Sequence, residues 1–141
     1  MGIKLRVGEA RRFTNKMKFI GKESLEVAAD TLEEKAEDIQ DLAKRQAPVD
    51  THNLENAIKI DGPNIGRDKV EIEVYVEGQK NDYDVIMHEG TYNLGKKSKA
   101  KQESDMSVRV GDKYLARAYE ELQPSIKKAV QKDLNNLYRR F

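Results

Sequence analysis

The 141-residue sequence predicts an α+β domain, in which helices pack on one face of a small antiparallel sheet. Three observations predict this class. A helical pattern of apolar residues runs from about residue 22 to 47, alternating strand-like patterns fill the middle, and a second helical pattern begins near residue 112. Strands that follow one another without helices between them usually pair antiparallel, and flanking helices then cover one face. We expect one domain over residues 22–141, preceded by a basic N-terminal arm over residues 1–21.

Residues 1–21 allow two interpretations. Ile3, Leu5 and Val7 alternate with two basic residues, which is typical of a short half-buried strand. Further basic residues interleave with aromatic and methionine side chains, which favours an arm that orders on a partner, although chain termini are commonly poorly ordered. The basic residues of this arm that could face a partner or DNA are Arg11, Arg12, Lys16 and Lys18.

The strongest predicted element is the long helix that ends near residue 47. Apolar residues recur along it at steps of three and four, and the opposite face is acidic. Pro48 ends the helix, because a residue before proline avoids helical dihedral angles. The predicted buried stripe consists of Leu25, Ala28, Ala29, Leu32, Ala36, Ile39, Ala43 and Ala47.

The middle of the chain predicts strands. Turn-forming residues at 61–64 separate the end of the first element from the clearest strand, residues 69–77, where Val and Ile alternate with Glu and Tyr. Residues 83–88 also alternate and are predicted to form its antiparallel partner. Residues 107–110 fit a short returning strand.

Residues 92–107 are predicted to be a long mobile loop, because small and polar residues accompany a cluster of lysines. Its candidate partner- or DNA-facing residues are Lys96, Lys97, Lys99 and Lys101. The chain then ends in a helix from about residue 112. Pro124 lies inside that pattern and predicts a kink or a break into two helices.

Composition argues against several functional classes. The chain has no cysteine, so disulfides and thiolate metal sites are excluded, and its two histidines, His52 and His88, lack the spacing of a zinc site. No serine has a nucleophile context and no glycine loop fits phosphate. We therefore expect no catalysis, no cofactor and no metal. No apolar run approaches the ~18 residues that a membrane-spanning helix needs.

Charge is strongly segregated along the chain despite a net charge of +1. Residues 1–22 carry +6, residues 23–47 carry −5, residues 48–95 carry −6, and residues 96–111 and 112–141 each carry +3. Such segregation can guide subunits together or place basic segments near a polyanion, and it is also typical of ordinary solvated surfaces.

Three motifs in a fixed order resemble a known family. Residues 47–54 read Ala-Pro-Val-Asp-Thr-His-Asn-Leu and resemble the Ala-Pro-Val-Asp-Thr-Gly-x-Leu signature of tailed-phage head–tail joining proteins, also called neck or tail-completion proteins, of the minor tail component type. Residues 83–91 are similar to the family's Tyr…Val-Glu-x-Gly-Thr segment, and residues 111–118 to the motif that opens its C-terminal helix. His52 replaces the family's usual glycine, and the family's proline near Lys113 is missing.

The resemblance implies structural roles for a set of motif residues, and we expect Val49 to make an apolar contact. These residues are Ala47, Pro48, Val49, Asp50, Thr51, Leu54, Glu89, Gly90, Thr91, Leu115 and Ala118.

The resemblance also implies a virion protein, assembled in the bacterial host cytoplasm, that forms a ring at the head–tail junction as a neck, tail-completion or tail-terminator protein. Its expected partners are copies of itself, with six copies as our guess, a connector or head-closure protein above and the tail-tube protein below. Non-specific DNA contact in the channel is a further expectation, and no membrane contact is expected. The alternative is an accessory protein that binds nucleic acid through its basic arm and loop.

Overall fold

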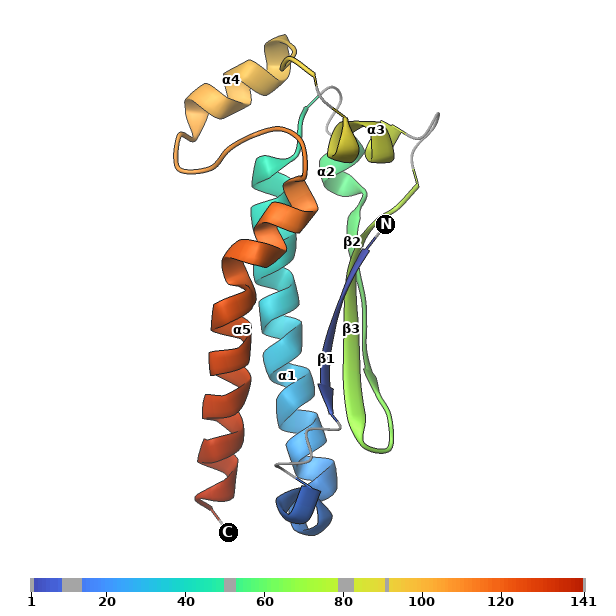
Figure 1. The fold of residues 1–141 in the computed structure, drawn as a ribbon, viewed down its shortest axis with the longest axis vertical. Helices are drawn as coiled ribbons and strands as arrows, with labels where there is room; N and C mark the ends of the chain where they lie inside the picture. The colour runs from blue at the N-terminus through green and yellow to red at the C-terminus, as the bar shows by residue number, and fades with distance from the viewer. Residues whose placement is uncertain (1, 9–13, 50–52, 79–82, 91, 141) are drawn as a thin grey trace.

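A computed structural model describes residues 2–8, 14–49, 53–78, 83–90 and 92–140 of the chain. It shows the predicted α+β fold, with a long N-terminal helix, a three-stranded antiparallel sheet and a C-terminal helix (Figure 1). The elements in chain order are β1 (Gly2–Gly8), α1 (Thr14–Gln46), α2 (Asn53–Asn56), β2 (Ile58–Ile65), β3 (Lys69–Val76), α3 (Tyr83–Glu89), α4 (Lys96–Ser104) and α5 (Tyr114–Tyr138).

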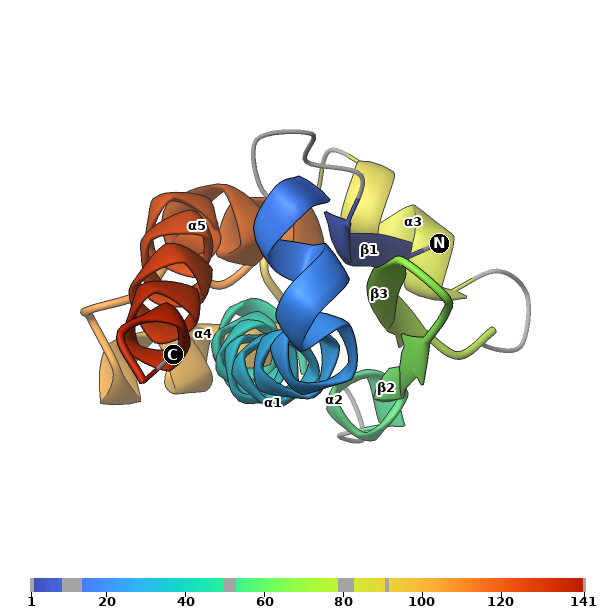
Figure 2. The same cartoon turned by 90° about the horizontal axis from the view of Figure 1, so that it is seen from below.

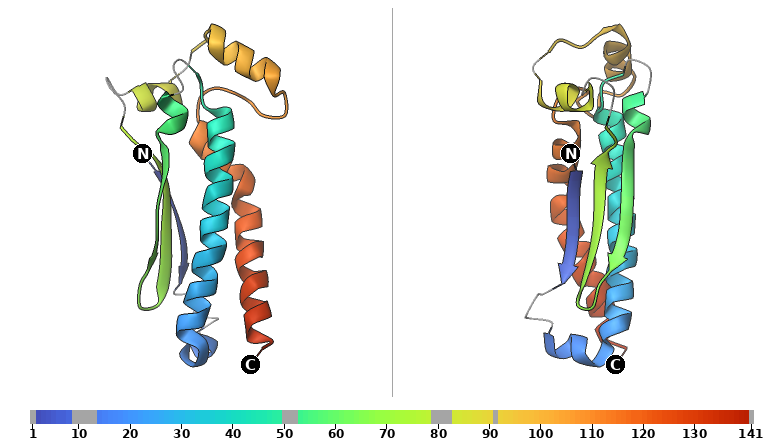
Figure 3. Two further views of the ribbon diagram at one scale, coloured as in Figure 1. Left: turned by 180° about the vertical axis from the view of Figure 1, so that it is seen from behind. Right: turned by 90° about the vertical axis from the view of Figure 1, so that its right-hand side faces the viewer.

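Helix α1 is the centre of the molecule, because it lies between α5 and the sheet (Figure 2). All eight residues of its predicted apolar stripe are buried. The Thr31 hydroxyl lies 2.7 Å from Asp133 Oδ2 and joins α1 to α5. The helix begins at Thr14, earlier than predicted, and its first turns run across the lower end of the molecule before it turns upward (Figure 3).

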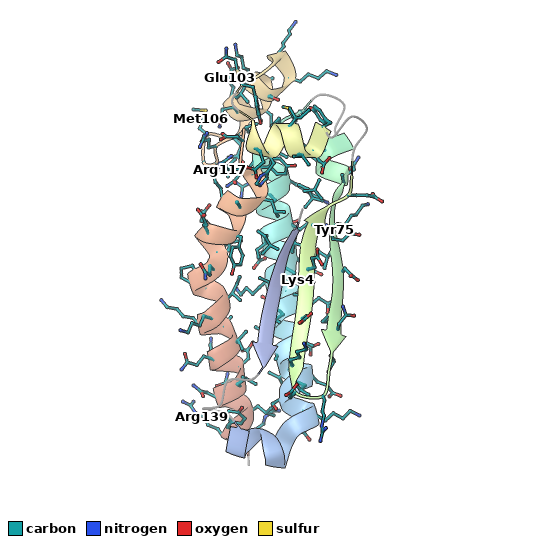
Figure 4. The ribbon with its side chains drawn as sticks, turned by 45° about the vertical axis from the view of Figure 1, so that its right-hand side comes forward. Lys4, Tyr75, Glu103, Met106, Arg117 and Arg139 are labelled. Atoms are coloured by element: carbon teal, nitrogen blue, oxygen red, sulfur yellow. The ribbon has the colours of Figure 1, made fainter. Side chains whose placement is uncertain are left out.

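The sheet has the order β1-β3-β2, with β3 in the middle. The predicted alternation in β3 is confirmed, because its Val and Ile side chains are buried against the helices. Leu5 of β1 pairs with Ile72 of β3, so residues 2–8 belong to the sheet of their own chain. Lys4 and Tyr75 lie on the face of the sheet that α1 and α5 do not cover (Figure 4).

The predicted turn at residues 61–64 is wrong, because β2 continues through them. The register between β2 and β3 shifts between Asp61 and Asn64, and Gly62 has a φ of 107° that glycine tolerates best. Such a bulge accommodates Pro63, which cannot donate to a ladder and is tolerated on an edge strand. The chain reverses after Ile65 instead, where Gly66 N–H donates to Lys69 O at 2.7 Å.

The strand predicted at residues 83–88 is also wrong, because these residues form helix α3. A segment of seven residues also holds the i, i+4 pairs that share one face of a helix. Asp84 and His88 are four apart and both are buried, whereas Val85 and Ile86 face solvent. A segment this short does not allow periodicity to distinguish the two structures.

The loop predicted over residues 92–107 contains helix α4, and residues 107–110 do not form the predicted strand. Helix α4 has no apolar stripe, and Ser98 is its only buried residue. Lysine, alanine, glutamine and glutamate nevertheless all favour a helix. The hydrophobic pattern therefore gave no indication of helix α4, whereas the helix propensities of its residues did.

Helix α5 is one helix that passes through Pro124, rather than two helices. Pro124 lies on its exposed side. Leu115, Ala118, Ile126, Val130 and Leu134 are buried on the opposite side, mostly against α1. Among the described residues, no helix is both long and apolar enough to cross a membrane.

Candidate assembly site at the upper end of the helices

The three motif segments lie far apart in the sequence and meet at the upper end of the molecule (Figure 1). Gly111 N–H donates to Gln46 O at 2.9 Å, which joins the third motif to the end of α1. Lys113 N–H donates to His88 O at 2.7 Å, which joins the third motif to the second. We call this assembly of residues 47–49, 83–90 and 111–118, together with α4 that packs on it, the apical junction.

Ser98 of helix α4 makes two hydrogen bonds to the first motif. Val49 N–H donates to Ser98 Oγ at 2.8 Å, and the same hydroxyl donates to Val49 O at 3.1 Å. Val49 is buried as expected, as are Ala47, Pro48 and Leu54. Asp50, Thr51 and His52 lie outside the described residues. The N–H and C=O groups of Val49 are buried away from water, so the Ser98 hydroxyl supplies the hydrogen bonds that water would otherwise make.

Lys101 closes the C-terminal end of α1, in contrast to the outward position predicted for it. Its ammonium donates to Lys44 O at 2.5 Å and to Ala47 O at 2.7 Å, and it pairs with Glu55 of α2. An ammonium has three N–H groups, so all of them are used within the chain. A cation near the last carbonyls of a helix also interacts favourably with the helix dipole.

His88 links α3 to the start of α5. Its buried ring lies edge-on to Tyr114, with the ring centres 4.9 Å apart. Nε2 accepts the N–H of Ala116 at 3.3 Å, while Nδ1 lies 2.9 Å from Glu89 Oε1. This pair of partners fits a neutral ring with its proton on Nδ1.

Glu89 and Gly90 continue the second motif. Lys113, which hydrogen-bonds Glu89, and His88 lower the pKa of the Glu89 carboxyl. Gly90 N–H donates to Ile86 O at 2.8 Å. A Cβ at Gly90 would lie 2.5 Å from that oxygen, which explains why glycine stands there. Thr91 lies outside the described residues.

The third motif turns into α5 through an unusual backbone. Lys113 has a φ of 54° and directly precedes the helix, while Gly111 has a φ of 151°. Leu115 and Ala118 are buried. Arg117 donates to Asp112 O at 2.8 Å and to Arg109 O at 2.9 Å, and burial lowers the pKa of its guanidinium. The turn is therefore held by side-chain donors as well as by glycine.

The predicted partner-facing basic residues do not form one cluster. Lys96, Lys97 and Lys99 are exposed on α4 at the upper end. Lys16 and Lys18 lie in the first turns of α1 at the lower end, and their side chains are not described (Figure 3). Arg11 and Arg12 lie outside the described residues. Contact of any of these residues with DNA or a partner stays a prediction.

Several residues that build the junction were not predicted from the sequence. Ser98 was expected to lie in a polar loop. Nothing in the sequence distinguishes Gln102, which accepts Val110 N–H at 2.8 Å and donates to Val108 O at 2.6 Å. Arg45 pairs with Asp105 at 2.9 Å. No sequence pattern distinguishes polar residues that form such contacts from polar residues that face solvent. In the described part of the chain, no three metal-ligating side chains gather.

Comparison with known protein families gives a match over most of the chain. The family model described as "Bacteriophage HK97-gp10, putative tail-component" matches residues 11–114. The match covers α1 and all of the first two motifs, and it ends where α5 begins. No curated protein and no solved structure matches the chain.

Proposed function

Because the chain belongs to the HK97-gp10-like family of bacteriophage tail components, we propose that it forms a ring at the head–tail junction of a tailed phage. The family supports a structural role in the tail and a place in the virion. The proposal adds the ring, its position at the junction and its assembly in the host cytoplasm. Its partners would be further copies of the chain, a connector or head-closure protein above, and the tail-tube protein below.

The observation that carries the proposal is the apical junction. Hydrogen bonds fix α3, α4 and the turn before α5 onto the end of two long packed helices. The same end exposes apolar side chains, since Val85, Ile86 and Met106 are 43%, 57% and 76% exposed. Exposed apolar groups on a firmly held frame suit contact with another protein. A tail component of this kind is expected to bind another virion protein through such an end.

The test is the mass of the purified protein in solution by light scattering, alone and with connector or tail-tube protein. A ring, or a monomer that becomes a ring only with a partner, supports the proposal. Six copies is the number we expect. Two results together would overturn the proposal: the chain stays monomeric in solution with every partner, and a virion reconstruction places it away from the head–tail junction.

A second candidate function is nucleic-acid binding, which the exposed lysines of α4 favour. Lys96, Lys97 and Lys99 lie within four residues of one another on one short helix. Contacts of lysine with phosphates give affinity without sequence readout, and that affinity falls steeply with salt. Salt-dependent binding of the monomer to duplex DNA, together with indifference to tail proteins, would favour this function over the ring.

A further inference from the structure

The exposed face of α1 is an acidic stripe. Its members are Glu23, Glu26, Asp30, Glu33, Glu34, Glu37, Asp38 and Asp41, and all of them are exposed. They recur at steps of three and four, so they share one side of the helix. At 1.5 Å per residue the stripe is about 27 Å long. We call it the α1 acidic face.

The lower half of α5 carries the opposite charge. The exposed cationic residues in this half and directly after its end at Tyr138 are Lys127, Lys128, Lys132, Arg139 and Arg140. Figure 4 shows Arg139 at the lower end of the helix. Asp133, the acidic residue in this stretch, is half-buried and lies against Thr31 of α1 rather than among the lysines. We call this set of five cationic residues the α5 basic face.

The two faces lie at the same height along the molecule. Helices α1 and α5 run antiparallel, and the bond between Thr31 and Asp133 places these two residues level with each other (Figure 1). Both helices rise 1.5 Å per residue, so residues 127–138 of α5 lie level with about residues 26–37 of α1. The α1 acidic face carries five of its eight members within those heights.

Among the residues that the structure describes, few cations neutralise the α1 acidic face. Among the described residues its ion pairs are Lys22 with Glu26 at 3.9 Å and Lys35 with Asp38 at 3.7 Å. Glu26, Asp30 and Glu34 follow one another at steps of four, and like charges at that spacing destabilise a helix. A cationic surface from outside the molecule would relieve this repulsion.

We infer that the α1 acidic face of one copy docks on the α5 basic face of the next copy, head to tail around the ring. This inference rests on the proposed function. A rotation about an axis parallel to the two helices keeps every residue at its own height, so the matched levels within one chain become matched levels between neighbours. Each copy then has one acidic and one basic face to offer, which is what a heterologous interface requires. Charge complementarity of this kind mainly fixes register and excludes wrong partners.

Charge reversal tests the inference. The acidic-face variant is Glu26→Lys, Asp30→Lys and Glu34→Lys, and the basic-face variant is Lys128→Glu, Lys132→Glu and Arg139→Glu. Each variant alone should need at least tenfold more protein to assemble than the wild type, in the buffer and with the partner that support wild-type rings. The chain with all six changes should assemble again, because its faces have exchanged charge. Asp61→Lys with Asp68→Lys, exposed on β2 and in the turn after it, is the control and should assemble normally.

Mixing gives a second readout. The acidic-face and basic-face variants should assemble in a one-to-one mixture, and only into rings with even copy numbers, because each variant can bind only the other. Melting curves check that every variant is folded. Rings formed equally well by both single-face variants would overturn the interface and leave the ring intact. A six-change chain that stays monomeric, or a wild type that stops at two copies, would also overturn it. A wild type that never assembles would overturn the proposed ring itself.

Discussion

At the scale of single residues, the apical junction depends on polar side chains that replace water for buried backbone groups. Lys101 and Ser98 serve three carbonyls and one N–H at the end of α1 and just beyond it. The buried contacts of these two residues could not be predicted, because the sequence of a polar segment does not show whether a lysine or serine faces solvent or a helix end. Val49 was predictable, because it sits in a distinctive motif and is apolar.

Lys101→Met should lower the free energy of unfolding by about 2 kcal/mol, because two carbonyls and Glu55 lose a charged donor. Chemical denaturation of the monomer measures it. Lys99→Met is the matched control, since Lys99 is exposed on the same helix, and it should change stability by no more than about 0.5 kcal/mol. Equal effects of the two substitutions would contradict the capping role of Lys101.

Tyr92 makes stability depend on alkaline pH. Its hydroxyl donates to Met87 O at 2.6 Å, and burial is the main cause that raises its pKa from 10.0 to about 12. A raised pKa in the folded state means that its stabilising contribution is complete below pH 10 and is lost as the pH rises from 10 toward 12. Burial raises the pKa of Tyr114 as well, so it adds to the same trend.

We expect Tyr92→Phe to flatten the decline of unfolding free energy above pH 10, and to lower stability modestly near neutrality because the hydrogen bond to Met87 is removed. Urea denaturation at pH 8, 10 and 11 gives the slope. Tyr75→Phe, on the open face of the sheet, serves as the matched variant. A slope that Tyr92→Phe leaves unchanged would show that Tyr92 ionises alike in folded and unfolded chains.

At the scale of elements, length decided what the sequence could predict. Helix α1 and strand β3 have enough repeats for one period to dominate, and both were predicted with the correct buried face. Helix α3 has seven residues, so a step of two and a step of four fit it equally well. Helix α4 buries only Ser98 and is placed by hydrogen bonds, which hydrophobic periodicity cannot detect.

For residues 2–8 the structure fits the first of the two interpretations, a short half-buried strand. Residues 2–8 pair with β3 along their whole length, and Leu5 is 4% exposed. We expect Leu5→Ala to destabilise the monomer by about 2–5 kcal/mol, as large-to-small core substitutions do. Lys4→Ala, on the exposed side of the same strand, should have a small effect. A normal melting temperature for Leu5→Ala would mean that the strand packs on a neighbouring copy instead of its own core.

At the scale of the whole molecule, segregated charge matters more than the net charge of +1. The lysines of α4 lie at the upper end, whereas the α5 basic face lies at the lower end (Figure 1). If α4 faces DNA in the channel, its lysines and the α5 basic face have different functions that can be tested separately. One set would bind phosphates, and the other would hold the neighbouring copy.

We therefore expect Lys96→Gln, Lys97→Gln and Lys99→Gln together to leave ring formation intact and to weaken DNA binding by the assembled protein. Removal of each lysine that neutralises a phosphate should reduce the slope of log affinity against log salt by about 0.9. Titration of duplex DNA at several salt concentrations measures that slope. An unchanged slope would show that α4 faces a protein or solvent.

The position of α5 in the chain has a consequence for timing. The apolar stripe of α1 is synthesised early. Part of the surface that buries it comes from α5, which follows every other described element. The bond between Thr31 and Asp133 joins residues that are 102 positions apart. During synthesis the ribosome therefore releases α1 with that side still bare, and the core closes only once α5 has emerged. The same delay applies to the α5 basic face. A growing chain therefore lacks the second of the two docking faces proposed above, so it can end a row of copies but cannot help to close a ring until its translation is finished.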